Sequence, residues 1–469
     1  MPNSRPERSS RGISLAAKGA LFVLATTAFL LYANARNNPV PPRLTQAEED
    51  LARAAHETHD PSAAALRHGS PRLHRLRAFT DGYPAGYLPE FRSTAPRARS
   101  AIVVAAATGE VLLERNADER IPPASMTKLV AMYVALDAAR SGEISLDDEV
   151  EPPPDSWAVN LPPRSSLMFL GEGQTVTVRE LLSGMASVSG NDAAIALAYR
   201  VSGSVPSFVE RMNGAVAALG LVQTRFVEPS GLSEHNVTTA REFASFCLAY
   251  LAEFPEALAA FHSLREFAFP LDRNYRDGRR AATVRQAATN RMLASLPGCD
   301  GLKTGYIDES GYNIALTAAR GGERYLAVIM GGEGADSREG NRIRTEDGTA
   351  LMDWAFSSWT TLELGEVEPV PMTVWGGGSL FAVAAGASSL AVPRVLTDGR
   401  KAGARVVTDS GITAPVRAGD EIGYVEYSIG GKPAYRRALV ADRSVEEYPL
   451  PVRALDAMAK ALSPLFRIR

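Results

Sequence analysis

Lysine is nearly absent from the central part of this chain, although arginine is frequent there. Six of the 50 basic residues are lysines, and only Lys128 and Lys303 lie between Arg97 and Trp359. A desolvated lysine can lose its proton, whereas an arginine keeps its charge. The two lysines are therefore expected at positions where a basic side chain has to lose its proton, which arginine cannot do. Their contexts, Ser125-Met126-Thr127-Lys128 and Lys303-Thr304-Gly305, indicate an activated serine.

Length and composition limit the number of domains and the kinds of partner and cofactor that the chain can have. The 469 residues are too many for one ordinary core and predict two or three folded units. A net charge of −3 gives no overall basic field, so we expect no nucleic-acid partner. His56-Glu57-Thr58-His59 lacks the spacing that puts two histidines on one helix face, and we expect neither a metal nor a cofactor. Cys247 and Cys299 are interpreted as buried thiols, with a bridge between them as the alternative in an exported protein.

The N-terminus has the features of an export signal. Basic residues precede an apolar run from Gly19 to Ala33, which ends in Ala33-Asn34-Ala35. We expect residues 1–35 to be either a signal peptide cleaved after Ala35 or an uncleaved anchor. Both alternatives place the rest of the chain outside the cytoplasm. Residues 36–98, rich in Pro, Ala and Arg, are interpreted as a tether.

Residues 99–359 predict a catalytic domain of the α/β (α+β) class. Two hairpins are indicated, one around Thr108-Gly109 and one around Gly321-Gly322. Between them, helices are expected after Pro122-Pro123, after the capping box Thr177-x-x-Glu180 and over 192–200. Strands at both ends with helices between them favour an antiparallel sheet flanked by helices.

The chain changes character near residue 360. Short apolar runs separated by turn residues predict a small all-β domain over 360–450. Residues 451–469 predict an amphipathic helix with Leu455, Met458, Ala459 and Leu462 near one face. Such a helix either packs on the β domain or lies at a membrane surface.

Three short motifs carry chemistry. Lys128 follows Ser125 by three residues, so both lie on one helix face, and a Lys128 kept neutral by partial burial and by Lys303 could accept the serine proton. In Ser189-Gly190-Asn191 the serine can relay a proton and the amide can hold a substrate amide. Lys303-Thr304-Gly305 is expected on an edge strand, along which an extended substrate can pair.

The order Ser-x-x-Lys, Ser-x-Asn, Lys-Thr-Gly is that of penicillin-binding proteins and β-lactamases. Within that group the chain resembles the serine D-alanyl-D-alanine carboxypeptidases among low-molecular-mass penicillin-binding proteins. Further matching stretches are Asn116-Ala117-Asp118, Leu181-Leu182-Ser183-Gly184-Met185, Asn191-Asp192-Ala193-Ala194, Met212-Asn213, Glu228-Pro229-Ser230-Gly231-Leu232 and Asp300-Gly301-Leu302-Lys303. The resemblance implies a β-lactamase/transpeptidase-like catalytic fold.

The resemblance also implies residue roles. Ser125 would be the acylated nucleophile and Lys128 its base, with Ser189 and Asn191 as the second motif. Substrate would be bound by Lys303, Thr304, Gly305, Tyr306 and Arg344. The backbone N–H groups of Ser125 and Tyr306 would form the oxyanion hole, and Arg344, ten residues before Trp354, would bind the terminal carboxylate. Ile307 stands where the family often has threonine.

The function implied is removal of the terminal D-alanine from peptidoglycan stem pentapeptides, with β-lactams as inhibitors. Membrane attachment would involve the N-terminal segment and the C-terminal helix. A β-lactamase, a DD-endopeptidase and a catalytically weak peptidoglycan-binding scaffold are the alternatives.

Overall fold

The computed structural model describes residues 26–33, 35–36, 77–78, 89–93, 96–385, 389–397, 402–409 and 411–461. The chain forms two compact units. The larger unit comprises Ala54–Glu363 and Ser389–Gly399, and the smaller unit comprises Met1–Arg53, Leu364–Ser388 and Arg400–Arg469. The motif His56-Glu57-Thr58-His59 lies outside the described residues. The domain boundaries expected from the sequence stay predictions.

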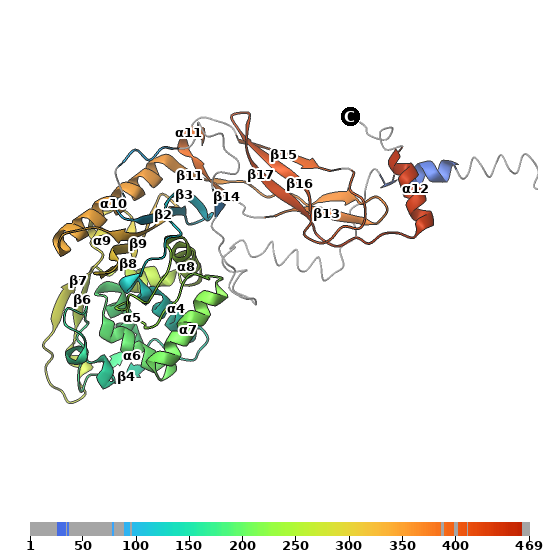
Figure 1. Ribbon diagram of the computed structural model, residues 1–469. Coiled ribbons are helices and arrows are strands. Elements are labelled where there is room, and N and C mark those ends of the chain that lie inside the picture. The colour runs from blue at the N-terminus through green and yellow to red at the C-terminus, as the bar shows by residue number, and fades with distance from the viewer. Residues whose placement is uncertain are drawn as a thin grey trace, which may run out of the picture. The chain divides into compact units, whose positions relative to one another are not determined.

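A six-stranded sheet forms the centre of the larger unit (Figure 1). Its strand order is β1-β3-β2-β10-β9-β8, and all neighbours are antiparallel except β1 and β3. The strands are β1 (Arg77–Ala78), β2 (Ser100–Ala105), β3 (Glu110–Arg115), β8 (Cys299–Ile307), β9 (Gly311–Arg320) and β10 (Glu323–Gly332). Both expected hairpins are present as β2–β3 and β9–β10. Because β10 pairs with β2, the first and last parts of the unit meet at the middle of the sheet.

Alternating side chains of β2 pack into two separate hydrophobic cores, one on each face of the sheet. Ile102 and Val104 belong to the core beneath one face, whereas Ala101 and Val103 belong to the core beneath the other. The first core is closed by α4 (Thr127–Arg140), α5 (Val178–Ser187), α6 (Asn191–Ser202), α7 (Val205–Ala218) and α8 (Ala240–Glu253). The second is closed mainly by α10 (Ser337–Ser358) and the short α9 (Met292–Ser295).

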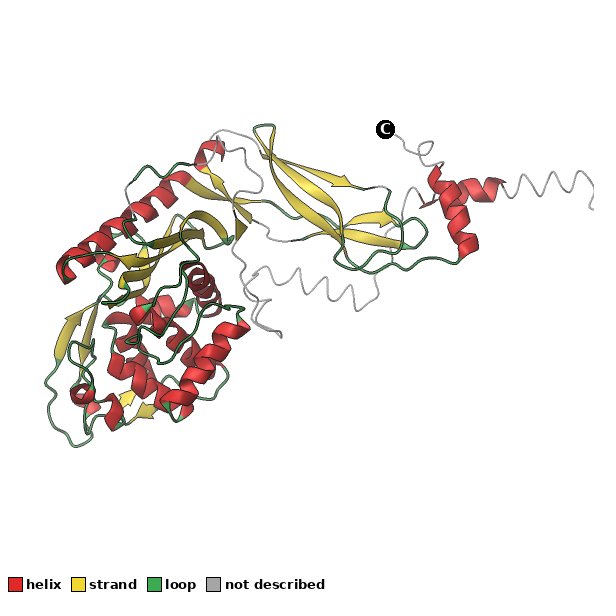
Figure 2. Cartoon of the chain, viewed as in Figure 1, coloured by secondary structure: helices red, strands yellow, loops and turns green. Residues whose placement is uncertain are grey.

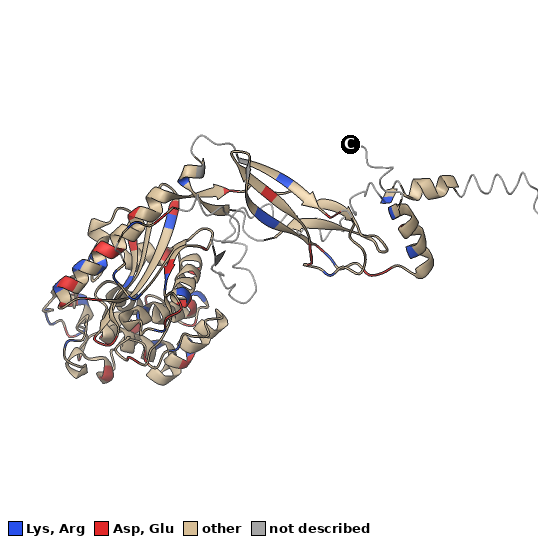
Figure 3. Ribbon diagram, turned by 45° about the horizontal axis from the view of Figure 1, so that its top comes forward, with Lys and Arg blue, Asp and Glu red and all other residues tan. Residues whose placement is uncertain are grey.

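The helices begin where their local sequence predicts. Pro122-Pro123 leads into a 3-10 turn, Ala124–Met126, and α4 follows it directly. At α5, Thr177 and Glu180 form the expected reciprocal capping box. Short strand pairs, β4 (Glu149–Val150) with β5 (Val176–Thr177) and β6 (Glu266–Phe269) with β7 (Val284–Ala287), border these helices. Acidic and basic residues are interspersed over the outside of the unit, including along α10 (Figure 3).

The smaller unit consists mostly of strands (Figure 2). Its five strands run antiparallel in the order β12-β13-β17-β16-β15. They are β12 (Val370–Thr373), β13 (Ser379–Ala384), β15 (Ala402–Thr408), β16 (Glu421–Ile429) and β17 (Lys432–Ala441). The expected all-β domain is therefore confirmed. Between β13 and β15 the chain returns to the larger unit, where β14 (Ser389–Pro393) pairs with β11 (Trp359–Glu363) and α11 (Arg394–Thr397) follows.

Arg36 anchors the N-terminal segment within the smaller unit. Residues 26–33 and 35–36 are helical. The Arg36 guanidinium donates to both carboxylate oxygens of Asp456 at 2.9 Å and to the carbonyl oxygens of Val374 and Gly377. The Tyr32 hydroxyl donates to the same carboxylate. The residue that directly follows the segment with the features of an export signal, Arg36, is thus held in an ion pair with a buried carboxylate. Among the described residues, no helix is both long and apolar enough to cross a membrane.

Helix α12 (Leu450–Ala461) packs on the smaller unit through the side that carries Asp456 and Ala459. The side chains of Leu450, Leu455 and Met458 are 76%, 48% and 58% exposed. The expected apolar face is therefore divided, because Ala459 points inward while Leu455 and Met458 face solvent. Leu462 lies outside the described residues.

Cys247 and Cys299 are free thiols, Cys247 being buried and Cys299 half-buried. The alternative of a bridge between them is not realised in this structure.

Candidate active site

A cavity of about 440 Å³ lies where three segments of the larger unit converge. The first is the turn that carries Ser125, the second is the loop before α6 that carries Ser189, and the third is β8. Ser125, Ser189, Thr304, Gly305, Tyr306 and Arg344 all line the cavity. Lys128, Asn191 and Lys303 lie beneath it and are almost completely buried. The fold thus brings together all nine residues that the sequence singles out.

Lys128 lies at the centre of the site. Its Nζ donates to Ser125 Oγ at 3.0 Å, to Asn191 Oδ1 at 2.6 Å and to the carbonyl oxygen of Ser230. An ammonium group has three N–H donors, and these three acceptors use all of them. A neutral amine in the same place keeps two donors and gains a lone pair, which can accept the serine proton. The geometry therefore suits a proton transfer between Ser125 and Lys128.

Burial controls the protonation of both lysines. Desolvation lowers the pKa of Lys128 to about 7, against the opposing attraction of the Glu228 and Asp192 carboxylates. The causes predicted from the sequence are partial burial and Lys303, whereas in the structure the burial of Lys128 is complete and is the dominant cause. Desolvation also lowers the pKa of Lys303 well below its usual range, and the charges of Lys128 and Arg344 lower it further.

The backbone around the cavity adopts unusual conformations at residues that are not glycine. Ala124, next to the candidate nucleophile, has φ of 50°, and Ser189 has φ of 64°. Such conformations persist only where the surroundings enforce them, and they concentrate at functional sites. The buried Asp192, in the first turn of α6, accepts hydrogen bonds from the backbone N–H groups of Met168, Phe169, Leu170 and Ala193, and so ties residues 168–170 to the start of that helix.

Two glycines allow other segments to approach the serine turn closely. A Cβ on Gly305 would lie 2.6 Å from the carbonyl oxygen of Pro123 and 3.1 Å from the backbone nitrogen of Ser125. A Cβ on Gly231, whose φ is +85°, would lie 2.0 Å from the carbonyl oxygen of Ala124. The third motif therefore needs glycine because β8 packs directly against the backbone of the serine turn.

Arg344 is buried rather than an ordinary surface arginine. Its guanidinium donates to the carbonyl oxygens of Gly305 at 3.3 Å and Asn313 at 3.1 Å, and it packs against the Tyr312 ring. Burial lowers its pKa to about 10, so the side chain stays charged at neutral pH. Ile307, which departs from the family pattern, is buried and does not line the cavity.

Sequence reasoning gave no role to the network that supports Lys128 from below. The Glu228 carboxylate accepts from the backbone N–H groups of Ser230 and Gly231 and from the side-chain amide of Asn236. Asn236 also donates to Thr127 Oγ1 in the helix that carries Lys128. This network orients the Ser230 carbonyl toward Lys128. The only signal in the sequence was the stretch Glu228–Leu232, which was noted for resemblance alone.

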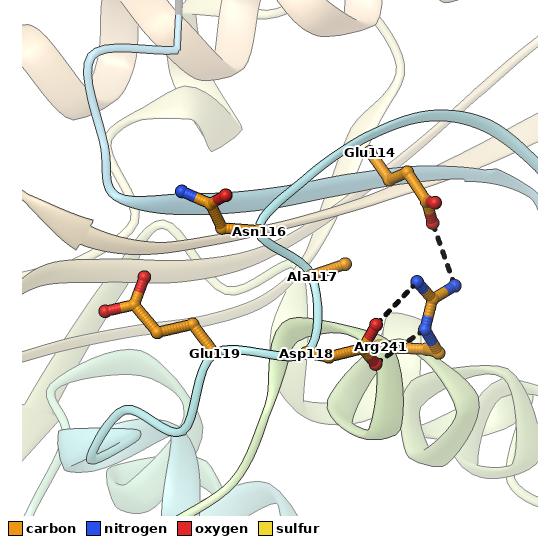
Figure 4. A pocket seen from close by; sticks show the side chains of 6 residues that line it. All are labelled: Glu114, Asn116, Ala117, Asp118, Glu119 and Arg241. Atoms are coloured by element: carbon orange, nitrogen blue, oxygen red, sulfur yellow. Dashed lines mark hydrogen bonds and ion pairs between the residues drawn. The ribbon is translucent and has the colours of Figure 1, made fainter.

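A second cavity, of about 500 Å³, lies at the end of β3 and is lined by Glu114, Asn116, Ala117, Asp118, Glu119 and Arg241 (Figure 4). Arg241 points between Glu114 and Asp118 and forms ion pairs with both. The residues that line this second cavity include no serine, cysteine or lysine nucleophile, and its single arginine is already paired with two carboxylates. The cavity at Ser125 is therefore the candidate active site.

Comparison with known families gives two matches along the chain. Residues 90–334 match the D-alanyl-D-alanine carboxypeptidase family Peptidase_S11. Residues 365–447 match the C-terminal domain of penicillin-binding protein 5. The first match contains Ser125, Lys128, Ser189, Asn191 and the third motif, while the second covers all five strands of the smaller unit's sheet.

Individual relatives agree with these family matches. The chain is 35% identical over 376 residues to the D-alanyl-D-alanine carboxypeptidase DacC of Escherichia coli, which covers 78% of this chain and 88% of the relative. Among solved structures, penicillin-binding protein 5 of Haemophilus influenzae is 30% identical with a TM-score of 0.62, covering 75% of this chain and 98% of that one. Penicillin-binding protein 6B of Escherichia coli is 27% identical with a TM-score of 0.60, covering 76% and 99%.

Replacing Gly305 with alanine tests the close contact between β8 and the serine turn. We expect the added methyl group to push the backbone of Ser125 away, lowering the free energy of unfolding by about 1–3 kcal/mol and slowing acylation of Ser125 by a reactive ester. Thermal melting and acylation kinetics report the two effects. Gly214→Ala is the control, because a Cβ there meets nothing within 4 Å. Unchanged melting and acylation in Gly305→Ala would contradict the argument.

Proposed function

The chain belongs to the D-alanyl-D-alanine carboxypeptidase family, and we propose that it removes the terminal D-alanine of peptidoglycan stem peptides through an acyl-enzyme on Ser125. It is a serine-type carboxypeptidase with the penicillin-binding protein fold. The observation that carries the assignment of Ser125 is the 3.0 Å contact between its Oγ and the buried Lys128 Nζ.

Acylation begins with proton transfer. Neutral Lys128 accepts the Ser125 hydroxyl proton while Oγ forms a bond to the carbonyl carbon between the two terminal D-alanines. The backbone N–H groups of Ser125 and Tyr306 stabilise the negative charge on the carbonyl oxygen. The C–N bond then breaks, and the leaving D-alanine takes up a proton that Lys128 returns through Ser189. Among the described residues Ser189 Oγ has no hydrogen bond to the protein and lines the cavity, which suits this relay.

Deacylation reverses the same proton path with water as the nucleophile. Lys128 accepts a proton from the water, which attacks the ester carbonyl, and the Ser125 oxygen leaves and regains its hydrogen. The residues that line the cavity include no aspartate or glutamate. A second base of the kind that gives β-lactamases rapid turnover is therefore not present at the cavity wall. We infer that β-lactams acylate Ser125 and are released slowly.

The substrate lies along β8, an edge of the six-stranded sheet. Its backbone pairs with the Lys303-Thr304-Gly305 segment, and Asn191 holds an amide of the part that stays on the enzyme. Lys303, which donates to the Thr304 carbonyl at 2.9 Å, keeps the segment in place. The D-alanine carboxylate is bound at Arg344, which has donors left after its three contacts.

We propose an extracytoplasmic location at the membrane surface. The N-terminal segment supplies the export signal, and α12 presents Leu450, Leu455 and Met458 outward beside Arg453 and Lys460. Exposed apolar side chains with basic neighbours suit the interface of an anionic membrane. The contacts of Arg36 with Asp456 hold the N-terminal segment beside the same helix.

Replacing Ser125 with alanine tests the catalytic assignment. We expect wild type to release D-alanine from a peptide ending in D-Ala-D-Ala, and Ser125→Ala to release none and to lose penicillin labelling. Ser357→Ala, on the exposed part of α10, is the control and should behave as wild type. Penicillin labelling retained by Ser125→Ala would remove Ser125 as the nucleophile. Labelling of wild type without D-alanine release would instead favour an endopeptidase or a wall-binding role.

The pKa of Lys128 predicts the pH dependence of acylation. Lys128 is a base only when neutral, so the rate of Ser125 acylation should rise about tenfold per pH unit below pH 7 and level off above it. Above pH 7, Lys128→Arg should slow acylation by about 10²–10⁴, and the difference from wild type should shrink as the pH falls, because arginine does not deprotonate. Stopped-flow measurement of β-lactam acylation from pH 5 to 9 checks both. A flat wild-type profile over that range would contradict the role of Lys128.

Replacing the outward residues of α12 tests membrane binding. In protein that begins at residue 26, we expect Leu450→Ser/Leu455→Ser/Met458→Ser to weaken co-sedimentation with anionic vesicles at least about tenfold, because apolar burial is lost. The control changes three exposed valines of the larger unit, Val159, Val222 and Val227, to serine. Equal vesicle binding by both variants and the unchanged protein would reject α12 as a membrane contact.

A further inference from the structure

The active-site cavity carries more positive charge than a single carboxylate needs. Three arginines line it, Arg164, Arg291 and Arg344, and no acidic residue does. Arg344 is bonded to Gly305, Asn313 and Asn341. Within the described parts of the chain, by contrast, the guanidinium groups of Arg164 and Arg291 make no hydrogen bond or ion pair. Two cations therefore face the cavity with their hydrogen-bonding capacity unused.

Arg164 is held in place by its neighbours rather than by its own side chain. Its φ is 68°, a conformation that costs an arginine energy and that glycine would adopt freely. The residues that follow are fixed firmly. The carbonyl of Ser166 accepts from the backbone N–H of Asn191 at 2.8 Å, and the carbonyl of Leu167 accepts from Gln286 at 3.0 Å. The backbone thus presents an exposed, unpaired arginine at the cavity rim.

The two unpaired arginines lie near different residues of the active site. Arg291 lies near enough to Arg344 for its charge to lower the pKa of that guanidinium. Arg164 belongs to the segment bonded to Asn191, the residue that holds the acyl part of the substrate in the proposed function. Arg291 and Arg344 therefore serve the end of the cavity that receives the terminal carboxylate. Arg164 faces the part of the substrate that stays on the enzyme.

We propose that Arg164 binds a second carboxylate, carried by the side chain of the residue that precedes D-Ala-D-Ala. This subsite rests on the proposed function and defines its substrate class as stem peptides with a free carboxylate at that side chain. A lysine side chain at the same position would bring an ammonium group toward Arg164 and would be disfavoured by like-charge repulsion.

A matched pair of peptides tests the subsite. Acetyl-L-2-aminopimelyl-D-Ala-D-Ala carries a side-chain carboxylate, and its side-chain amide is nearly identical in shape. For wild type at low salt we expect kcat/KM to be about fivefold higher for the carboxylate, as suits an exposed ion pair. In Arg164→Gln and Arg164→Gly the ratio should fall to about one, because hydrolysis of the carboxylate peptide slows. The glycine variant relieves the backbone conformation as well, so agreement between the two variants assigns the effect to charge.

Two further variants separate this subsite from its surroundings. Arg338→Gln, an exposed arginine of α10 that does not line the cavity, should keep the fivefold ratio. Arg291→Gln should lower kcat/KM for both peptides and leave their ratio unchanged. A ratio of one in wild type, or a fivefold ratio that survives in both Arg164 variants, would overturn the subsite alone. Failure of wild type to hydrolyse either peptide would overturn the proposed function and the subsite with it.

Discussion

The buried amino group of Lys128 is the constraint around which the larger unit is organised. A fully buried cation is unfavourable unless its donors are satisfied and its charge can be lost. Both conditions are met, because Ser125, Asn191 and Ser230 supply three acceptors from three separate segments, and burial brings the pKa to about 7. Each acceptor needs its own support. Asp192 ties the backbone of residues 168–170 to the start of α6, which carries Asn191, and Glu228 holds the turn whose carbonyl reaches Lys128. One amino group thus fixes how these segments meet.

Close backbone approach is the second requirement of the site. Gly305 and Gly231 allow β8 and the turn after Glu228 to lie directly against the serine turn, where any side chain would collide with backbone atoms. Ala124 and Ser189 adopt left-handed backbone conformations beside the same cavity. The energy that these conformations cost is offset by the large buried cores on both faces of the sheet. The site is therefore rigid before substrate arrives, which suits a reaction that depends on aligned donors and acceptors.

Much of this arrangement could be predicted from local sequence, and the remainder depends on contacts that local patterns do not contain. Hairpins, the capping box of α5 and the three motifs have signatures within a few residues, so the sheet, the helices and the meeting of the three motifs at one cavity could be predicted. Asp192 acts through the backbone N–H groups of residues 168–170, and the turn of Glu228 is joined through Asn236 to Thr127 in α4, and neither contact is revealed by local spacing. Arg164 appeared unremarkable because its significance lies in lacking a partner. The return of residues 389–399 to the larger unit follows from pairing with β11, which only the fold displays.

The ion pair between Arg36 and Asp456 can form only late in the synthesis of the chain. The two residues are 420 positions apart, and the side chain of Asp456 is fully buried. A ribosome that has made the first part of the chain has produced the guanidinium long before the carboxylate exists. Until synthesis reaches α12, the contacts of Tyr32 and Arg36 with the Asp456 carboxylate cannot form. Completion of the chain supplies the missing carboxylate, so this ion pair can join the first and last described helices only after both have been made.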